Sequence, residues 1–410
     1  MQTDNNSVAD VTIIGGGMVG LSLAIALLQQ NLSVVIIDAN EISTEISEQP
    51  QARVSALTRA SENWLQQLNA WQAIPKNRCS AYRKMQIWNA NSKAQLHFEA
   101  SDLAQPNLGH IIENSVICAA LATSLYSLQS QEIKTKEKQL RVLQAAHCQK
   151  VEIDADRVSI QVCENEQFKA QTIHSSLVIA ADGGRSWLRQ QLSIAISTYS
   201  YQQDALVALV ESEKTHQHCA WQKFTEDGPL AFLPMKPLNL HSIVWSCEHH
   251  KAQQLLQMEA QEFTQQLNSQ MDNRFGQLKL RSPLSSFPLI ATHARRYTGH
   301  RYALVGDAAH TIHPLAGQGV NLGFLDAKAL SETLGKMKKS GQDLGEANQL
   351  RVYERARYGD NLSVQLAMTG LYKMFSQQKN VSSFAIQEGM NLINQSAFIK
   401  RKLMKRAMGL

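Results

Sequence analysis

The sequence of 410 residues has few cysteines and few aromatic residues, and it lacks a long uninterrupted apolar run. Its six cysteines form no close pair, which excludes zinc-finger spacing and a redox pair and is typical of a reducing compartment. The apolar run over residues 11–28 contains four glycines, and no other stretch reaches the length of a membrane-spanning helix. No secretory leader pattern is seen near the start. We therefore expect a cytoplasmic protein without a metal centre.

Charge is also scarce, and its distribution is uneven. Charged residues make up 18% of the chain and hydrophobic residues 44%, which are values typical of a globular protein. The net charge of +5 comes from 40 basic and 35 acidic residues. The tail from Lys400 to Leu410 holds five basic residues and no acidic one, so the rest of the chain has no net charge. This distribution excludes the broad basic surface that nucleic-acid binding requires.

The first candidate site lies where a predicted strand, a glycine-rich turn, a helix and a second strand follow one another over residues 9–37. Three glycines and the acid that closes the second strand form the dinucleotide-binding fingerprint: Gly15, Gly17, Gly20 and Asp38. In this fingerprint the glycines permit a tight turn and the close approach of a pyrophosphate, and the acid can bond ribose hydroxyls.

A polar stretch over residues 40–51 predicts a loop. Arg53 follows it and begins a pattern of helical spacing that runs through Val54, Leu57 and Trp64 to Leu68. We expect a helix from Arg53 onward. The cation could hold a phosphate of the bound nucleotide or form an ordinary surface salt bridge.

The second candidate site follows a buried strand that begins near residue 177. The strand ends at Asp182 and Gly183, and Ser186 begins a short helix that carries Arg189. A carboxylate, a glycine and a helix start at the carboxyl end of a strand are the features that a doubly wound sheet places at its ligand crevice.

The third candidate site is the stretch over residues 301–323. A short buried strand is broken at Gly306, and Asp307 can accept hydrogen bonds from a ribose or from backbone amides. Pro314, Gly317 and Gly319 follow and predict a turn that leads to a helix start. Asn321 then begins a second apolar run with helical spacing. Amide groups at a helix start favour negative charge. Alone, this stretch would also fit an ordinary strand–loop–helix connection.

Between the second and third sites, short β-branched and aromatic segments predict a β-rich insertion with a hairpin turn at Asp227 and Gly228. Such an insertion could hold an apolar substrate against a cofactor. The predicted organisation comprises nucleotide-binding segments 1–80, 111–190 and 286–375, substrate-binding segments 81–110 and 191–285, and a helical tail 376–410.

The three motifs together resemble those of the group A flavoprotein monooxygenases, which share the fold of para-hydroxybenzoate hydroxylase. The glycine fingerprint and the Gly306-Asp307 pair match, as does the Asp-Gly-x-x-Ser-x-x-Arg pattern at Asp182, Gly183, Ser186 and Arg189. Within this group, residues 306–323, residues 108–117 and the Met-Gly-Leu end resemble the hydroxylases of ubiquinone biosynthesis. The members that act at ring position C5 are the most similar, and those that act at C1 or C6 share the same motifs.

The resemblance implies an α/β fold with a Rossmann-like FAD-binding domain, an interleaved β-rich substrate domain and C-terminal helices. It also implies FAD as cofactor, NAD(P)H and O₂ as co-substrates, and hydroxylation of a lipophilic prenylated phenol through a flavin C4a-hydroperoxide. A protein complex for ubiquinone biosynthesis is the implied partner. No residue is identified as an acid–base catalyst, because the cofactor carries the chemistry.

By the same resemblance, the glycine fingerprint and Asp38 hold the ADP half of FAD, and Asp307 contacts the ribityl chain. Asp182 and Gly183 contribute to FAD and NAD(P)H binding, and Arg53 lies near the flavin. Pro314, Gly317 and Gly319 are expected near the isoalloxazine. The remaining predicted cofactor-binding residues are Gly306, Gln318 and Asn321. For His310 and His313 we expect structural or hydrogen-bonding roles beside the flavin.

Several alternatives stay open at this stage. Reduction of isoprenoid double bonds uses a similar fold, and a non-catalytic flavin-binding scaffold would carry the same motifs. A halogenase is disfavoured because no Trp-x-Trp-x-x-Pro signature occurs. No second glycine fingerprint occurs, so we expect the nicotinamide donor to visit transiently. The cationic tail over residues 398–410 predicts either peripheral contact with the inner membrane or an ordinary helix docked on the body.

Overall fold

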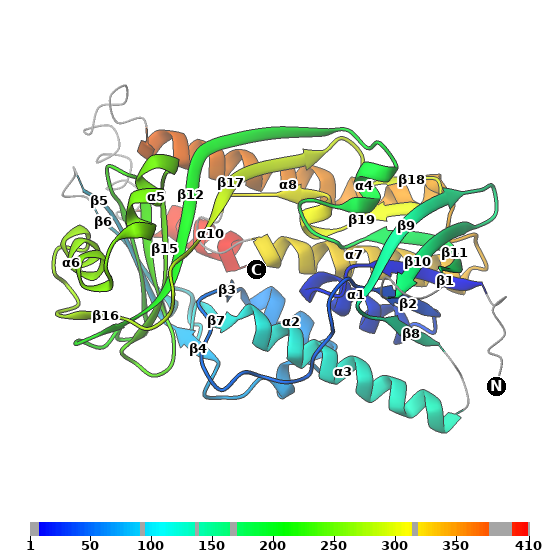
Figure 1. The fold of residues 1–410 in the computed structure, drawn as a ribbon, viewed down its shortest axis with the longest axis horizontal. Coiled ribbons are helices and arrows are strands. Elements are labelled where there is room, and N and C mark those ends of the chain that lie inside the picture. The colour runs from blue at the N-terminus through cyan, green and yellow to red at the C-terminus, as the bar shows by residue number, and fades with distance from the viewer. Residues whose placement is uncertain are drawn as a thin grey trace.

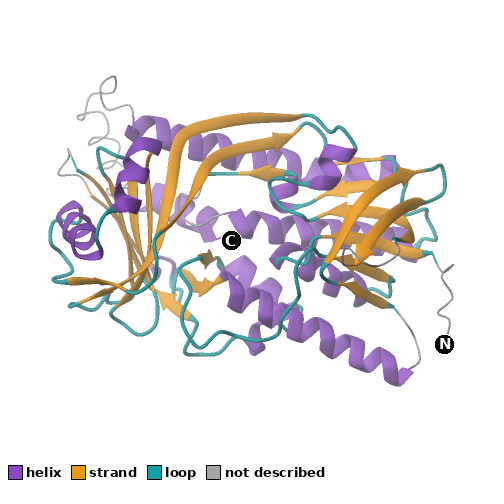
Figure 2. Cartoon of the chain, viewed as in Figure 1, coloured by secondary structure: helices purple, strands orange, loops and turns teal. Residues whose placement is uncertain are grey.

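The computed structural model describes residues 8–90, 95–135, 139–164, 170–313, 319–376 and 396–408. The chain forms two parts, one built on a largely parallel sheet with helices against it and one dominated by a larger, mostly antiparallel sheet (Figure 1). Figure 2 shows how helices and strands are distributed between the two parts. This arrangement confirms the predicted α/β fold class with a β-rich second part.

Five parallel strands form the centre of the first sheet, in the spatial order β8–β2–β1–β11–β19. They are β1 (Ala9–Ile14), β2 (Val34–Ile37), β8 (Leu140–Leu143), β11 (Gln171–Ala180) and β19 (Tyr302–Leu304). The chain winds from β1 through β2 to β8 on one side and continues through β11 to β19 on the other. The order therefore reverses between β1 and β11, which is where doubly wound sheets bind ligands outside the carboxyl ends of their strands.

Helices cover this sheet and bury its apolar side chains. They are α1 (Met18–Leu28), α3 (Asn114–Thr135), α4 (Trp187–Gln191), α7 (Gly319–Lys339) and α8 (Ala347–Ser376). Helix α1 is buried from Gly20 to Leu28 because α3 and α7 pack against it. Its sequence is accordingly apolar on all sides, as expected for a helix without a solvent face. The sheet is extended by the strands β9 (Ala146–Ile153), β10 (Val158–Glu164) and β18 (Thr298–Gly299).

The second sheet has nine strands, in the order β20–β17–β12–β15–β14–β13–β5–β6, with β16 paired to β12. Its strands are β5 (Lys84–Asn89), β6 (Gln95–Glu99), β12 (Ile196–Ser212), β13 (Cys219–Phe224), β14 (Pro229–Pro234), β15 (Leu240–Glu248), β16 (Leu278–Leu280), β17 (Ser285–Ala294) and β20 (His310–Thr311). The predicted hairpin at Asp227 and Gly228 joins β13 to β14. Strand β17 pairs with β12, so the residues just after the predicted boundary at 285 lie in this sheet.

Two further helices, α5 (His249–Gln257) and α6 (Ala260–Gln270), pack their apolar sides against the second sheet. Short 3-10 turns occur at η1 (Trp71–Ala73), η2 (Ala100–Leu103) and η3 (Gly306–Ala308). Among the described residues, no helix combines the length and the apolar character that crossing a bilayer requires.

A small third sheet lies beside both parts, and it corrects one prediction. It contains β3 (Val54–Leu57), β7 (Gly109–Glu113) and β4 (Ser80–Tyr82). The prediction that a helix begins at Arg53 is wrong, because Val54–Leu57 pairs with β7 and α2 (Arg59–Gln67) begins only after it. The Thr58 hydroxyl accepts from the Ser61 amide and caps this later helix start. Pairing with a distant strand outweighed the local helical spacing.

The C-terminal helix α10 (Ala397–Met408) packs on the body of the protein. Met404 and Met408 are buried against Ala100 and Leu108. The ammonium of Lys400 also forms an ion pair with Asp102 at 2.7 Å. The tail is thus a docked part of the fold, as one of the two predicted alternatives required.

Candidate functional site

The glycine fingerprint follows β1, and its three glycines differ in what surrounds them. Gly15 has φ +107, and a Cβ there would lie 2.4 Å from the carbonyl oxygen of Ala181. A Cβ on Gly20 would lie 1.9 Å from the carbonyl oxygen of Gly15. A Cβ on Gly17, by contrast, would meet nothing within 4 Å. The outer two glycines are therefore required by the turn itself, whereas Gly17 faces open space where a pyrophosphate could approach.

Asp38 follows β2 and lies beside this turn. Its Oδ2 accepts from the amide of Gly16 at 2.5 Å, and its Oδ1 accepts from the amide of Asn40 at 2.7 Å. A cavity of about 200 Å³ opens beside the carboxylate, lined by Gly16, Gly17, Leu21, Asp38, Asn40, Glu41, Ile42, Ser43 and Cys118. Burial raises the pKa of the Cys118 thiol to about 11, so this thiol stays neutral in the cavity. The cavity offers a carboxylate and a glycine turn to a nucleoside.

The second motif follows β11, on the other side of the crevice. Asp182 Oδ2 accepts from the amide of Trp187 at 2.7 Å, so this oxygen caps α4. Its Oδ1 is buried without a hydrogen-bond partner among the described residues. Burial raises the pKa of Asp182, and the bonds from Ser186 and the start of α4 oppose this rise. Gly183 has φ +82, and a Cβ there would meet nothing within 4 Å.

Arg189 joins the second motif to the third. The residue is 5% exposed, and its guanidinium donates to the carbonyl oxygens of Gly184 at 2.7 Å and Ala308 at 2.8 Å. Burial lowers the pKa of this guanidinium, and Asp182 opposes the shift. The sequence motif predicted an arginine here but not its contact with the turn after β19.

The third motif follows β19 and turns at Gly306, which has φ +58. Asp307 is exposed to solvent, although protein atoms surround it closely. Burial raises the pKa of Asp307, whereas His310 and Arg53 lower it. Arg53 therefore lies near Asp307, and its guanidinium stands over the ring of Phe287 at 5.4 Å. Within the described ranges Arg53 forms no ion pair, so its charge is available to a ligand.

Asn321 is buried and bonded within the protein. Its Oδ1 accepts from the Thr58 amide at 3.0 Å and from the Ser61 hydroxyl at 2.6 Å, and its Nδ2 donates to Ala56 at 2.9 Å. These bonds tie the start of α7 to β3 and α2. Gly319 begins α7 beside open space. Three of the predicted cofactor-binding residues lie outside the described residues: Pro314, Gly317 and Gln318.

Sequence reasoning missed Asp326, which lies on α7 with no exposed surface and bonds to His310 at 2.5 Å. An acidic residue among the apolar positions Phe324, Ala327 and Leu330 was the available signal, because a buried carboxylate requires partners. His313 is also buried, and neither of its ring nitrogens has a partner among the described residues. Burial lowers the pKa of His313 to about 4.

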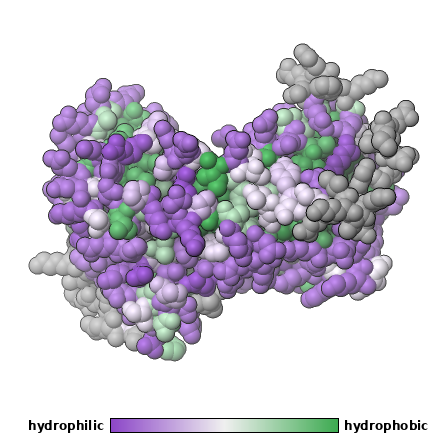
Figure 3. All heavy atoms as spheres, turned by 90° about the horizontal axis from the view of Figure 1, so that it is seen from below, coloured by the Kyte–Doolittle hydropathy of each residue, from purple (hydrophilic) through white to green (hydrophobic). Residues whose placement is uncertain are grey.

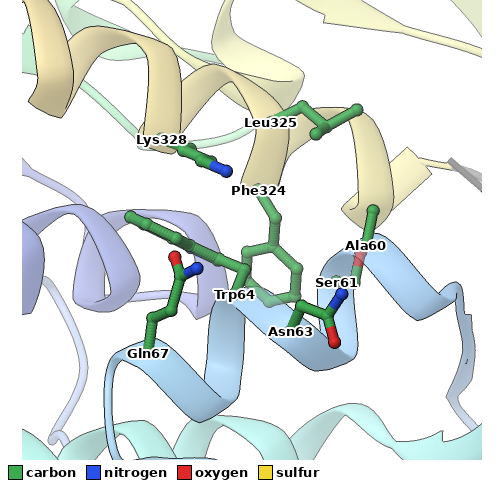
Figure 4. A pocket seen from close by; sticks show the side chains of 8 residues that line it. All are labelled: Ala60, Ser61, Asn63, Trp64, Gln67, Phe324, Leu325 and Lys328. Atoms are coloured by element: carbon green, nitrogen blue, oxygen red, sulfur yellow. The ribbon is translucent and has the colours of Figure 1, made fainter. Parts of the chain in front are cut away.

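A second hollow of about 240 Å³ lies between α2 and α7. Lys328 and Phe324 project from α7 toward Trp64 and Gln67 of α2 (Figure 4). It is lined by Ala60, Ser61, Asn63, Trp64, Gln67, Phe324, Leu325 and Lys328, and none of these belongs to the three motifs. The hollow borders the start of α7, because the hydroxyl of Ser61 in its lining donates to Asn321 at 2.6 Å.

Residues 8–358 match the family model described as FAD binding domain. The chain belongs to this family. It is 33% identical to 3-demethoxyubiquinol 3-hydroxylase of Escherichia coli over 99% of this chain and 100% of that protein. It is also 33% identical to ubiquinone hydroxylase UbiL of Rhodospirillum rubrum, over 98% of this chain and 90% of the relative. This family member is therefore placed among the FAD-dependent hydroxylases of ubiquinone biosynthesis.

Solved structures share the fold at low sequence identity. The p-nitrophenol 4-monooxygenase PnpA of Pseudomonas putida has a TM-score of 0.77 with 16% identity and covers 98% of both chains. Pseudomonas aeruginosa PqsL in complex with 2-aminobenzoylacetate has a TM-score of 0.76 with 18% identity, covering 93% of this chain and 100% of PqsL. The predicted family, the predicted enzyme class and FAD with NAD(P)H as co-substrate are confirmed.

The described residues of this FAD-binding family member fit its cofactor. Gly17 leaves open space at the start of α1, the amide end of which favours a pyrophosphate. Asp38 borders a cavity beside that turn, and Asp307 presents an accessible carboxylate at the third motif. These groups match an extended dinucleotide. Its phosphates would lie at the glycine turn, and its hydroxyl groups on either side would donate to Asp38 and Asp307.

Proposed function

We propose that this protein hydroxylates a polyprenylated phenol of ubiquinone biosynthesis at ring position C5. The reaction uses FAD, NAD(P)H and O₂. The observation that carries this proposal is the placement of three cofactor motifs at the carboxyl ends of neighbouring parallel strands. Arg189 joins the second and third motifs, and the chain is similar over its whole length to ubiquinone-pathway hydroxylases. Positions C1 and C6 are the alternative sites of hydroxylation within the same family.

Bound FAD, once reduced by NAD(P)H, supplies the activation of O₂. The chain's own residues then have to bind FAD, orient the phenol ring and exclude water from the reacting centre. In this proposal Asp38 holds ribose hydroxyls of the adenosine half and Asp307 accepts from the ribityl chain. The Arg53 guanidinium, near Asp307, stabilises negative charge that develops beside the flavin.

An apolar contact between the small sheet and the β-rich sheet supports water exclusion. Ala56 and Ile111 of the small sheet form one buried cluster with Leu209, Met235 and Leu240 of the β-rich part. Because Nδ2 of Asn321 donates to the carbonyl oxygen of Ala56 at 2.9 Å, this cluster lies close to the third motif in space. The surface is also hollowed between the two parts, with apolar side chains at the bottom of the hollow (Figure 3). An apolar wall of this kind suits a prenylated ring.

The direct test measures oxygen insertion. Purified FAD-loaded protein is incubated with NADPH or NADH and a short-chain prenylated phenol under ¹⁸O₂, and the product is examined by mass spectrometry. We expect one ¹⁸O atom in the ring and NAD(P)H oxidation that rises with the phenol. Saturation of a prenyl double bond without oxygen uptake would instead identify a reductase. A yellow protein inert to NAD(P)H would identify a non-catalytic flavoprotein.

The ring position is tested in cells. A strain that lacks this gene should accumulate the quinone precursor that has not received the missing hydroxyl group. Accumulation of the precursor lacking the C5 hydroxyl supports the proposal. A precursor lacking the C1 or C6 hydroxyl assigns the enzyme to the alternative position.

We also propose that the protein contacts an anionic membrane surface or its pathway complex through the outward face of α10. Phe398 is 77% exposed, and Arg401, Lys402 and Lys405 are exposed on the same side by their spacing of three and four residues. The inward face is occupied, because Met404 and Met408 are buried. The predicted apolar stripe of Ile399, Leu403 and Ala407 involves side chains outside those described. A substrate of low water solubility makes such contact useful.

A further inference from the structure

Asp326 on α7 is a fully buried carboxylate that accepts four hydrogen bonds. Its Oδ2 accepts from the amide of Gly306 at 3.1 Å and from Nε2 of His310 at 2.5 Å. Its Oδ1 accepts from Nε of Arg357 at 2.9 Å and from Nδ2 of Asn361 at 3.0 Å. Oδ2 thus bonds only to the turn after β19, and Oδ1 bonds only to side chains of α8.

The electrostatics of this cluster keep the carboxylate ionised. Burial raises the pKa of Asp326, but the charges and hydrogen bonds of His310, Arg357 and Asn361 lower it further, so the net shift is downward. Arg357 is buried as well and donates to Asn361 Oδ1 at 2.7 Å. An ionised carboxylate only accepts hydrogen bonds, so His310 presents Nε2–H to it.

The two groups bonded to Oδ2 stand on either side of Asp307. Gly306 precedes it directly in a left-handed conformation, and His310 follows three residues later. Gly323, one turn before Asp326 on α7, brings the helix so close that a Cβ there would lie 3.4 Å from the Gly306 Cα. Helix α7 therefore holds both ends of the turn that presents Asp307 to the crevice.

The ion pair between Arg301 and Asp343, at the other end of β19, differs from the arrangement around Asp326. At the start of β19, Arg301 is buried and pairs with Asp343, whose side chain is 49% exposed. That pair holds the strand but contacts neither Asp307 nor the turn after it. A buried ion pair is often no better for stability than apolar packing, whereas several directional bonds fix an orientation.

We propose that Asp326 is a positioning residue for FAD, which fixes the Gly306–His310 turn so that the Asp307 carboxylate meets the ribityl hydroxyls. This rests on the predicted contact between Asp307 and FAD. The consequence is energetic coupling between Asp326 and Asp307, with no coupling between Asp326 and Asp38 at the other end of the dinucleotide.

The test is a double-mutant cycle on the FAD dissociation constant, measured by fluorescence of FAD released when the full-length holoprotein is diluted. We expect Asp326→Asn to weaken FAD binding at least tenfold. The double variant Asp326→Asn/Asp307→Asn should bind FAD no more weakly than Asp307→Asn alone. With Asp38→Ala, by contrast, the effects should multiply. Asp343→Asn should lower thermal stability yet change the FAD dissociation constant less than twofold.

The inference would be overturned by wild-type FAD affinity in Asp326→Asn, or by independent effects of Asp326→Asn and Asp307→Asn. An equal loss in Asp343→Asn would reduce Asp326 to a general stability role. If Asp307→Asn alone leaves FAD affinity unchanged, the predicted ribityl contact itself is wrong. Should Asp326→Asn not fold, His310→Gln keeps an amide donor toward Asp326 and should weaken FAD binding about threefold, again without adding to Asp307→Asn.

Discussion

Arg189 donates to the carbonyl oxygen of Ala308 over 2.8 Å, and this bond connects two motifs that are more than a hundred residues apart in the chain. The same guanidinium holds Gly184 next to Asp182. The loops after β11 and β19 are thus fixed relative to one another by one buried cation. The spacing of the cofactor motifs across the crevice depends on this bridge.

Replacing Arg189 with Met should destabilise the protein and weaken FAD binding. The carbonyl oxygens of half-buried Gly184 and of buried Ala308 would lose this donor, at about 1–3 kcal/mol each, with Gly184 at the lower end. We expect urea unfolding of the holoprotein to show a loss of about 2–4 kcal/mol. Arg185→Met, on the exposed side of the same loop, should change stability by less than about 0.5 kcal/mol. Equal losses of stability in the two variants would show that Arg189 does not bridge the two loops.

The glycine fingerprint makes a second prediction, because its members differ in their surroundings. Gly20→Ala places a methyl group on the carbonyl oxygen of Gly15 and should cost about 1–3 kcal/mol of stability. Gly17→Ala meets no protein atom, so it should fold normally but bind FAD more weakly. Thermal unfolding and FAD titration of both variants check this separation. Normal FAD affinity in Gly17→Ala would show that the pyrophosphate does not approach there.

The local parts of this architecture could be predicted from the sequence. The strand–turn–helix around Gly15 and the helix start at Ser186 depend on neighbouring residues, and the structure has both. The helix expected from Arg53 failed because pairing of β3 with β7 joins residues far apart in the chain. The bonds of Asp326 and Asn321 were missed for the same reason, since side-chain partners across helices leave no local pattern.

The β-rich part contains a histidine that should make its stability depend on pH. His241 is buried between aromatic rings, and its Nε2 lies 2.9 Å from the hydroxyl of Ser212. Burial lowers the pKa of His241 to about 3 from its ordinary value of 6.5, and the charge of His216 adds to the shift. The folded pKa is thus below the unfolded one. The stabilising contribution is complete above pH 6.5 and declines as the pH falls toward 3.

We therefore expect His241→Gln to flatten the pH dependence of unfolding between pH 6 and pH 4. The wild type should lose up to about 1.4 kcal/mol per pH unit more than the variant over this interval. Urea midpoints at several pH values provide the measurement. His250→Gln, which replaces an exposed histidine, should follow the wild-type curve. Parallel curves for the wild type and His241→Gln would show that this imidazole does not resist protonation.

The last prediction concerns the outward face of α10. Deleting the helix is a poor test of membrane contact, because removal of Met404 and Met408 would also uncover Leu108 and Ala100 in the body. Charge reversal leaves those contacts intact. The variant Lys402→Glu/Lys405→Glu should keep the wild-type unfolding temperature and FAD content.

The same variant should bind vesicles that contain phosphatidylglycerol at least tenfold more weakly, since each cation near an anionic surface contributes about 1 kcal/mol. Wild-type binding should also weaken with rising salt. The matched control is Arg351→Glu/Arg355→Glu, which makes the same change of charge on the exposed side of α8. If the control loses as much vesicle binding, net charge rather than α10 governs adhesion. If neither variant loses binding, α10 is only a docked helix of the fold, and its cations serve no membrane contact.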